Sequence, residues 1–482
     1  MVKYEAIIGL EVHVQVKTKS KMFSSCMYRY GESPNTLTDP TVLALPGTLP
    51  TINAEAVYQT VKAGMIFGCE IAAISKWDRK NYFYPDCPKN YQISQNDKPL
   101  CSGGSVEIEL EGPARNVMGE HRNVKLNRIH LEEDVGKLTH FEDESLVDYN
   151  RAGVPLMEIV SEPDIYSGAE AFAYLNSLRT YLMYAGISDC DMEKGQMRCD
   201  ANVSIRPVGQ KELGTRVELK NLNSISGVKH GIEYEILRQQ SVLKGGGAIS
   251  QETRRWNAET CMTTPMRTKE TTNDYRYFTD PDLMPIKISE EMKVDILSEL
   301  PEMPFAKQER FYWMYNLPYT ITSVLCPEKI LSDYFERTVK FHRGPRTIAN
   351  FITNDLLRMA NSMPLEDVCT KISPRNLAEL ARLVDDVAIS KQSGKEIFNE
   401  MYETGESAEA LVEKYGLRQN TNTDELRGIC RNIICDNQKA VNEFLAGKDQ
   451  AINVLKGQVI RATQGKASPQ LVDKIMRELL SL

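Results

Sequence analysis

The sequence predicts an α+β protein, in which a strand-rich N-terminal part precedes an all-helical C-terminal part. Up to about residue 290, segments of alternating apolar and polar residues are separated by turn signals and glycine. Pro301 and Pro304 then interrupt the chain, and helical periodicity dominates after them. A chain of 482 residues is long enough for two or three domains.

The composition is that of an ordinary soluble globular protein, because 41% of the residues are hydrophobic and 26% are charged. The chain has no run of about 18 apolar residues, which a transmembrane helix would need. The N-terminus lacks the basic and apolar segments of a secretory signal, so we expect a cytoplasmic protein. The eleven scattered cysteines contain no CxxC pair, which favours reduced thiols over disulfides. A net charge of −8 argues against a large general affinity for nucleic acid but leaves room for a local basic patch.

Three segments of the first part alternate with period two and carry an unusual polar face. They are Leu10–Val16, Met197–Arg206 and Val217–Lys220. A fourth, less regular stretch, Leu126–His140, concentrates histidines and carboxylates. The polar residues that we single out in these segments are Glu11, His13, His130, Glu132, Glu133, Arg198, Asp200, Asn202, Glu218 and Lys220.

Two arrangements explain these polar faces. A sheet with one solvated face is the default for antiparallel strands, yet Asp and Asn are depleted from strands. Since neighbouring strands lie about 4.8 Å apart, carboxylates and imidazoles from several strands can converge on one concave surface. Such a cluster is unfavourable unless a cation neutralises it, and mostly oxygen ligands with an occasional imidazole suit Mg²⁺ or Mn²⁺ better than zinc. We favour the metal-bearing face over the solvated one.

A basic and aromatic segment occupies Trp77–Asp86. Its Arg79 and Lys80 can hold phosphates, as can Arg198 and Lys220. An aromatic hairpin core with solvated cations at its edge explains the segment equally well. The chain has no GxxxxGK(S/T) and no GxSxG, HExxH or serine–lysine amidase pattern, so neither a P-loop nor hydrolytic chemistry has support.

Two Ser-Pro pairs, at 373–374 and 468–469, predict helix starts in the C-terminal part, because serine caps a helix and proline fits its first turn. Apolar stripes at helical spacing follow both pairs: Leu377, Leu380 and Leu383, then Leu471, Val472, Ile475 and Leu479. From residue 451 onward basic residues outnumber acidic ones: Lys456, Arg461, Lys466, Lys474 and Arg477 against Asp473 and Glu478. A small helical module that contacts a polyanion and a set of solvated helix faces both explain this bias.

Six long motifs in this order resemble the B subunit of the glutamyl/aspartyl-tRNA amidotransferase, the GatB family. They are IGLEVHVQVKTKSKMFSS, DRKNYFYPDCPKNYQISQ, HLEEDVGKLTH, DYNRAGVPLMEIVSEPD, MEKGQMRCDANVSIRP and VELKNLNS. The match runs through the first 290 residues, and the helical C-terminus resembles the family's YqeY-type tail. The resemblance implies a curved, mainly antiparallel N-terminal sheet similar to that of glutamine synthetase and guanido kinases, followed by all-α helical and YqeY-like tail regions.

The resemblance also implies an ATP- and Mg²⁺-dependent ligase that acts on misacylated tRNA. The family phosphorylates the side-chain carboxylate of Glu on tRNA(Gln) or of Asp on tRNA(Asn), and ammonia then displaces the phosphate. The ammonia comes from an amidase A subunit, and a small C subunit completes the heterotrimer; no membrane partner is implied. We therefore expect a catalytic cradle domain at 1–292, a helical domain at 293–410 and a tail that contacts tRNA at 411–482.

Site roles follow from the same resemblance. The residues expected to supply or support metal ligands are Glu11, His13, Glu132, Glu133, Glu158, Asp200 and Glu218. The residues expected to stabilise phosphate are Arg79, Lys80, Arg198 and Lys220, of which the last three also bind the nucleotide, and Asn202 is expected to orient a substrate group. Strand alternation allows only one of Glu132 and Glu133 to face the site, and the sequence leaves open which one.

The sequence departs from the family at a zinc site. Many relatives carry CxC followed by CxxC near the first motif, and here the corresponding positions are Ser24, Cys26, Asp39 and Val42. One thiolate of four is a poor set of zinc ligands, so we expect no structural zinc.

Two other functions stay open on the sequence alone. A non-catalytic scaffold that positions the tRNA acceptor end for a partner would need the basic tail but not the acidic strand faces. A metal-dependent ligase that acts on a small acid would not need the helical tail. Whether Glu-tRNA(Gln), Asp-tRNA(Asn) or both are used depends on which synthetases the cell contains.

Overall fold

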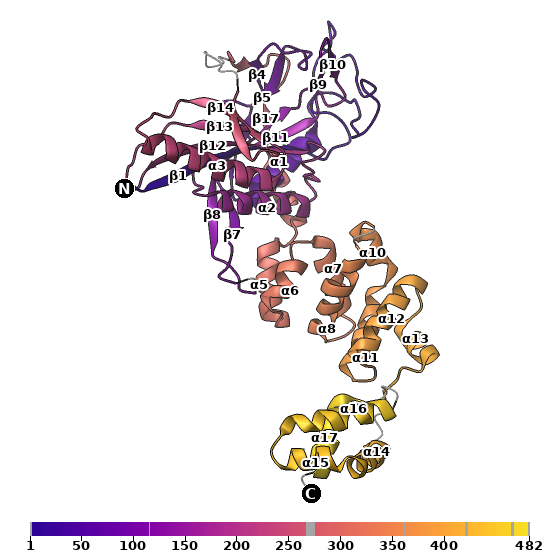
Figure 1. Ribbon diagram of the computed structural model, residues 1–482. Helices are drawn as coiled ribbons and strands as arrows, with labels where there is room; N and C mark the ends of the chain where they lie inside the picture. The colour runs from indigo at the N-terminus through magenta and orange to yellow at the C-terminus, as the bar shows by residue number, and fades with distance from the viewer. Residues whose placement is uncertain are drawn as a thin grey trace. The chain divides into compact units, whose positions relative to one another are not determined.

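A computed structural model describes residues 2–114, 116–266, 275–360, 363–419, 423–463 and 467–480 (Figure 1). The chain divides into two compact units, Met1–Met303 and Pro304–Leu482. The described strands all belong to the first unit, and the described regular elements of the second unit are helices. The predicted α+β class is therefore confirmed.

A large mixed sheet dominates the first unit. The strands of this unit are β1 (Tyr4–Gln15), β2 (Glu70–Ile71), β3 (Ile74–Ser75), β4 (Asp78–Asn81), β5 (Tyr91–Ser94), β6 (Cys101–Ser102), β7 (Ser105–Glu109), β8 (His121–Glu133), β9 (Lys137–His140), β10 (Ser145–Asp148), β11 (Pro155–Ser161), β12 (Met197–Pro207), β13 (Val217–Leu222), β14 (Glu252–Asn257), β15 (Met262–Pro265), β16 (Phe278–Thr279) and β17 (Ile286–Lys287). Among them the large sheet has the order β15-β14-β13-β12-β1-β11-β8-β6-β2, and β7 pairs with β8 beside this path. Its pairs are antiparallel except for β13 and β14, which run parallel. Small sheets join β9 to β10, β4 to β5 and β16, and β3 to β17.

The first strand of the chain, β1, lies in the interior of the large sheet, between β11 and β12. Its apolar residues Leu10, Val12 and Val14 are fully buried, whereas Glu11 and His13 between them are partly exposed. The strands predicted from period-two alternation within β1, β12 and β13 are confirmed.

Helices cover the apolar face of this sheet. The described helices of the first unit are α1 (Ala54–Ile66), α2 (Gly168–Tyr184), α3 (Ile225–Lys244) and α4 (Glu290–Glu299). Side-chain oxygens of Asn53, Ser167, Ser224 and Ser289 cap their N-termini. α2 and α3 lie side by side and pack against the sheet (Figure 1). Since these helices bury the apolar residues, the polar residues of the central strands lie on the opposite face.

The second unit is built from short helices. They are α5 (Pro304–Tyr315), α6 (Tyr319–Leu325), α7 (Lys329–Val339), α8 (Pro345–Asn350), the π-helix η1 (Phe351–Leu356), α9 (Leu357–Met359), α10 (Leu365–Lys371), α11 (Pro374–Asp385), α12 (Lys391–Thr404), α13 (Ala408–Tyr415), α14 (Thr423–Asp436), α15 (Gln438–Leu445), the 3₁₀-helix η2 (Asp449–Ala451), α16 (Ile452–Ala462) and α17 (Pro469–Leu480). Ser373 caps α11 by accepting the N–H of Asn376, and Pro374 begins the helix, as predicted. α17 likewise begins at Pro469, with Val472 and Ile475 buried.

Packing between helices shows how the chain divides into compact parts. α4 packs against α1, where Tyr58 donates to Glu299 over 2.9 Å, so the first unit extends past residue 292 to Met303. The second unit contains two hydrophobic clusters. Leu411 and Val412 are fully buried in the cluster formed by α5 to α13, whereas the cluster of the last helices begins at Leu426. Leu411 and Val412 therefore belong to the helical core that precedes the cluster of the last helices.

None of the described helices has a stretch that is long and apolar enough to cross a bilayer. The eleven cysteines are free thiols.

Candidate metal and phosphate site

The polar face of the central strands gathers imidazoles, carboxylates and a guanidinium. Residues directly opposite each other in an antiparallel pair share one face of the sheet. His13 on β1 lies opposite Glu158 on β11 and opposite Arg198 on β12. Glu158 lies in turn opposite His130 on β8, and Glu132 follows His130 by two residues. The register thus brings five side chains from four strands to one place.

Four of these side chains form a compact group, His13, His130, Glu132 and Glu158, which we call the His–Glu cluster. His13 Nε2 lies 3.6 Å from Glu132 Oε1 and 3.6 Å from Glu158 Oε2. His130 Nε2 lies 3.2 Å from Glu158 Oε2 and 3.9 Å from Glu132 Oε2. Ligand atoms of His13, Glu132 and Glu158 all lie within 4.8 Å of one another.

The two imidazoles and the carboxylates stabilise each other's charges. Burial opposes ionisation of Glu158, but hydrogen bonds from His13 and His130 outweigh it and hold the Glu158 pKa well below its usual range. Burial likewise opposes protonation of His13, yet the hydrogen bond to Glu158 and the charges of Glu158 and Glu132 raise the His13 pKa above its ordinary value. The raised His13 pKa and the lowered Glu158 pKa show that the cluster favours an ion pair between these two side chains.

The donors of the His–Glu cluster fit a divalent cation. Two carboxylates and two imidazoles provide the mixed oxygen and nitrogen ligands that Mn²⁺ accepts, and the carboxylates alone suit Mg²⁺. His130 Nδ1 is buried and has no hydrogen-bond partner among the described residues, so its ring is not held by a second acceptor on that side. A cation bound here would neutralise the carboxylates of Glu132 and Glu158.

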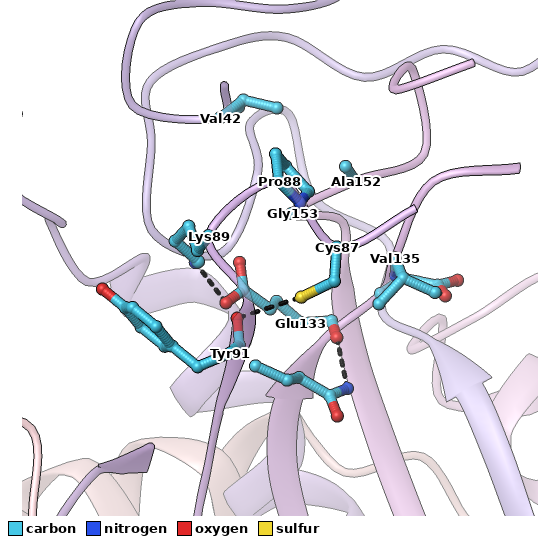
Figure 2. Close-up of a pocket in the computed structure, with 11 residues that line it drawn as sticks. Val42, Cys87, Pro88, Lys89, Tyr91, Glu133, Val135, Ala152 and Gly153 are labelled. Atoms are coloured by element: carbon cyan, nitrogen blue, oxygen red, sulfur yellow. Dashed lines mark hydrogen bonds and ion pairs between the residues drawn. The ribbon is translucent and has the colours of Figure 1, made fainter. Parts of the chain in front are cut away.

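Glu133 lies outside the His–Glu cluster. Its carboxylate pairs with the Lys89 ammonium and accepts the N–H of Ile93 over 3.0 Å on β5. Figure 2 shows this pair beside a small cavity, which Cys87 also lines. The cavity volume is about 10 Å³, room for about one water molecule. Of the two adjacent glutamates, the strand therefore brings Glu132 to the polar face and turns Glu133 away from it.

Two further predicted ligands, Asp200 and Glu218, contact a lysine instead, and a third, Glu11, contacts Asn202. Lys220 Nζ lies 2.6 Å from Asp200 Oδ2 and 2.9 Å from Glu218 Oε1, and these charges raise the Lys220 pKa against the effect of burial. Glu11 accepts a 2.8 Å hydrogen bond from Asn202, while burial and the nearby Glu158 raise the Glu11 pKa. Lys220 thus neutralises Asp200 and Glu218 without a metal.

Two of the other predicted cations border the His–Glu cluster, and one is bound elsewhere. Lys80 is half-buried, and the charges of Glu132, Tyr277 and Glu158 raise its pKa against the effect of burial. Arg198 lies beside His13 through the strand register. Arg79, in contrast, pairs with Asp280 over 2.7 Å and with Asp282 over 2.8 Å, and stacks 4.3 Å from the Tyr91 ring. Its guanidinium is already occupied by these partners.

Two residues of the face received no role from the sequence. His130 and Asp134 flank Glu132 at period two, so strand alternation was the signal that could have found them. His130 contacts Glu158 in the cluster, and Asp134 accepts a 2.8 Å hydrogen bond from Arg198 Nη2. Burial would raise the Asp134 pKa, but the nearby Arg198 charge outweighs this effect, so the Asp134 pKa is lowered.

The loop that follows β1 is held by hydrogen bonds at the positions where the family resemblance implies cysteines. Ser24 Oγ donates to Asp39, and the second Asp39 oxygen accepts the N–H of Val42 over 2.7 Å. Fully buried Lys21 donates to the carbonyl oxygens of Leu37 and Tyr149 over 2.7 and 3.3 Å. Burial lowers the Lys21 pKa to about 8. With a single thiol at these positions, the donor set does not fit zinc.

Comparison with known proteins places these observations in a family. The GatB/GatE catalytic domain matches residues 6–294, and the GatB domain matches residues 333–480. The B subunit of the aspartyl/glutamyl-tRNA(Asn/Gln) amidotransferase of Opitutus terrae is 58% identical over 99% of both chains. The proteins of the same name from Caldanaerobacter subterraneus and Brevibacillus brevis are 50% and 46% identical and are covered over their whole length. The chain therefore belongs to the family of aspartyl/glutamyl-tRNA(Asn/Gln) amidotransferase B subunits.

Proposed function

We propose that this chain carries the carboxylate-activating site of a tRNA-dependent amidotransferase. The reaction phosphorylates the side-chain carboxylate of Glu on tRNA(Gln), of Asp on tRNA(Asn), or of both, with ATP as phosphoryl donor. Ammonia from a glutamine-hydrolysing A subunit then displaces the phosphate and leaves Gln-tRNA(Gln) or Asn-tRNA(Asn) for translation. A small C subunit completes the proposed heterotrimer, which acts in the cytoplasm.

The chemistry explains why such a site needs this kind of polar face. A carboxylate is a poor electrophile toward ammonia because one of its oxygens would have to leave as oxide or hydroxide. Phosphorylation converts that oxygen into phosphate, which leaves easily. Phosphoryl transfer mainly requires alignment and neutralisation of charge on the transferred group. The observation that carries the proposal is the His–Glu cluster, bordered by the Lys80 ammonium and the Arg198 guanidinium.

The site residues divide into three proposed roles. His13, Glu132 and Glu158 would hold Mg²⁺, with His130 in support, and the bound ion would neutralise phosphate oxygens. Lys80 and Arg198 would contact the phosphates of ATP and the transferred group through charge-assisted hydrogen bonds. The residues around Lys220 form the third set, with Glu11, Asp200 and Glu218 as supporting carboxylates and Asn202 orienting the substrate.

Two predicted residues would act from further away. Arg79 would have to release Asp282, its more exposed partner, before it could reach a phosphate. Glu133 would hold Lys89 through their ion pair rather than bind the metal itself. The family resemblance further implies a fold like those of glutamine synthetase and guanido kinases, and tRNA contact by the tail; both are part of this proposal.

Glutamine formation driven by ammonium tests the proposal directly. The chain is reconstituted with its amidase and small subunits and supplied with Glu-tRNA(Gln), ATP, Mg²⁺ and ammonium chloride, and the amino acid released from the tRNA is identified. Since ammonium bypasses the amidase, only activation and amidation are measured. We expect Glu132→Gln to reduce the rate by about 100-fold or more, because it removes a ligand charge at the centre of the cluster.

Glu107→Gln is the matched control, because Glu107 also pairs with a histidine on this sheet, at 2.8 Å from His121, outside the cluster. This control should keep the rate, and both variants should keep tRNA binding and glutamine hydrolysis by the partner. Unchanged glutamine formation in Glu132→Gln and in His13→Ala would contradict the proposal. The chain would then be a scaffold that positions tRNA, and activation would belong to another subunit.

A further inference from the structure

Asp134 directly follows the last residue of β8 and is almost fully buried, with 3% of its surface exposed. Its Oδ2 accepts hydrogen bonds from Arg198 Nη2 over 2.8 Å and from Gln15 Nε2 over 3.1 Å. Its Oδ1 accepts the N–H of Val135 over 2.9 Å and lies 3.6 Å from Arg151 Nε. One buried carboxylate thus joins two guanidinium groups from different parts of the chain.

The protein fixes the position of this carboxylate firmly. The Asp134 backbone exchanges hydrogen bonds with Val154 and Gly153, each 2.8 Å long. Arg151, on the far side, donates to the carbonyl oxygens of Val135 and Gly136 over 2.9 and 2.7 Å. Because the carboxylate, its backbone and Arg151 are all anchored, Asp134 is a fixed point to which the more exposed Arg198 side chain attaches.

Arg198 attaches to this fixed point by one edge only. Its Nη2 donates to Asp134, whereas its Nε is buried and has no hydrogen-bond partner in the part of the chain that the structure describes. The guanidinium lies beside His13, and the charges of Asp134, Glu132 and Asp200 raise its pKa. A guanidinium that donates to a carboxylate along one edge still has N–H donors on another edge, and these can bind an anion.

We propose that Asp134 is a positioning residue, which holds Arg198 so that its remaining donors meet the phosphoryl group transferred at the His–Glu cluster. This inference rests on the proposed function, since it presumes that a phosphoryl group passes there. The ligand class is a phosphate with negatively charged oxygens, which a guanidinium binds through paired hydrogen bonds. Asp134 does not touch the substrate and acts only through Arg198.

A double-mutant cycle in the reconstituted heterotrimer tests this role. Ammonium-dependent glutamine formation is measured for Asp134→Asn, Arg198→Ala and the double variant. We expect Asp134→Asn to lower kcat about 10-fold with little change in KM for Glu-tRNA(Gln), because alignment of the transferred group is lost. In the Arg198→Ala background the same change should have no further effect, since Asp134 then has no side chain to position.

Two further variants separate positioning from a general structural role. Asp134→Glu keeps the charge that neutralises Arg151 and Arg198 but moves it by one methylene, so kcat should still fall while thermal stability stays near that of the wild type. Glu235→Gln is the matched control, because fully buried Glu235 also accepts hydrogen bonds from an arginine, Arg238, away from the cluster. This control should lower thermal stability and leave kcat per folded molecule unchanged.

The outcomes distinguish the inference from the proposed function. If Arg198→Ala lowers kcat but Asp134→Asn does not, or if the two effects simply multiply, Asp134 does not position Arg198 and the inference is overturned. If Arg198→Ala leaves kcat unchanged, the role of Arg198 in the proposed function fails as well. If kcat falls only in variants that also lose thermal stability in proportion, the role of Asp134 is structural and the inference is again overturned.

Discussion

Replacing Lys21 by methionine should alter how the stability of the first unit depends on pH. Lys21 is fully buried, and burial lowers its pKa from 10.5 to about 8. Between these values the unfolded chain keeps the proton that the folded chain has lost. The unfolded state therefore binds more protons, and the free energy of unfolding of the wild type rises with pH across this window. Lys21→Met has no such group, so its stability lacks this rise.

The magnitude follows from the two pKa values. Burying the protonated amine reduces the free energy of unfolding by about 3 kcal/mol at pH 7, about 2 kcal/mol at pH 9 and about 1 kcal/mol at pH 10. The hydrogen bonds to Leu37 and Tyr149 are lost in the variant and offset part of this gain. That offset shifts the absolute difference between the two proteins, but the change with pH remains. We expect the advantage of Lys21→Met over the wild type to shrink by about 2–3 kcal/mol from pH 7 to pH 10.

Urea unfolding at four values of pH, followed by tryptophan fluorescence, measures this difference. Trp77 is a suitable reporter because it is buried and contacts Phe23, two residues after Lys21, with ring centroids 5.0 Å apart. Trp313 is largely exposed in the second unit, so Trp313→Phe removes its signal from both proteins. A difference in stability that is constant from pH 7 to pH 10 would refute the reasoning, because Lys21 would then titrate as it does in water.

Three other changes give clear expectations. Gly119→Ala would place a methyl group 1.7 Å from a backbone carbonyl oxygen across the β7–β8 hairpin, so we expect a loss of about 1–3 kcal/mol or more in thermal unfolding. Lys89→Met leaves the Glu133 carboxylate buried without its cation, so we expect the free energy of unfolding in urea to fall by about 3–5 kcal/mol. The double variant with Glu133→Gln should recover part of this loss, because it also removes the buried charge. Arg461→Glu and Lys474→Glu should each weaken tRNA binding and reduce the slope of log affinity against log salt concentration by about one. Filter binding at several salt concentrations measures both effects. Unchanged affinity would argue against tRNA contact by these last helices.

The alternation of the central strands made their positions predictable, whereas long-range partners could not be read from the sequence. Period two identifies β1, β12 and β13 because one face of each is buried under helices. The choice between Glu132 and Glu133 depended on how β8 pairs with β11, which no local pattern determines. Arg79 has a basic and aromatic neighbourhood that suits phosphate, but its acidic partners lie about 200 residues further along the chain.

The basic bias of the last helices shows a similar limit. Lys456 pairs with Asp473 over 2.9 Å, and Arg477 pairs with Asp449 over 2.8 Å and with Asp473 over 3.0 Å. Their charges are therefore neutralised within the tail, and Lys466 lies outside the described residues. Arg461 and Lys474 remain as exposed basic residues, so the excess of positive charge that the sequence suggested is smaller in the folded chain.

The interior place of β1 has a consequence for how the protein is made. β1 is synthesised before both of its partners, because β11 begins at residue 155 and β12 ends at residue 207. At synthesis rates of about 5–20 residues per second, the two edges of β1 are not both paired until about 10–40 s after β1 has been synthesised. An unpaired strand with apolar residues on one face invites pairing with other nascent chains. Chaperones that bind extended apolar segments should therefore engage the nascent chain early and release it once β12 has emerged.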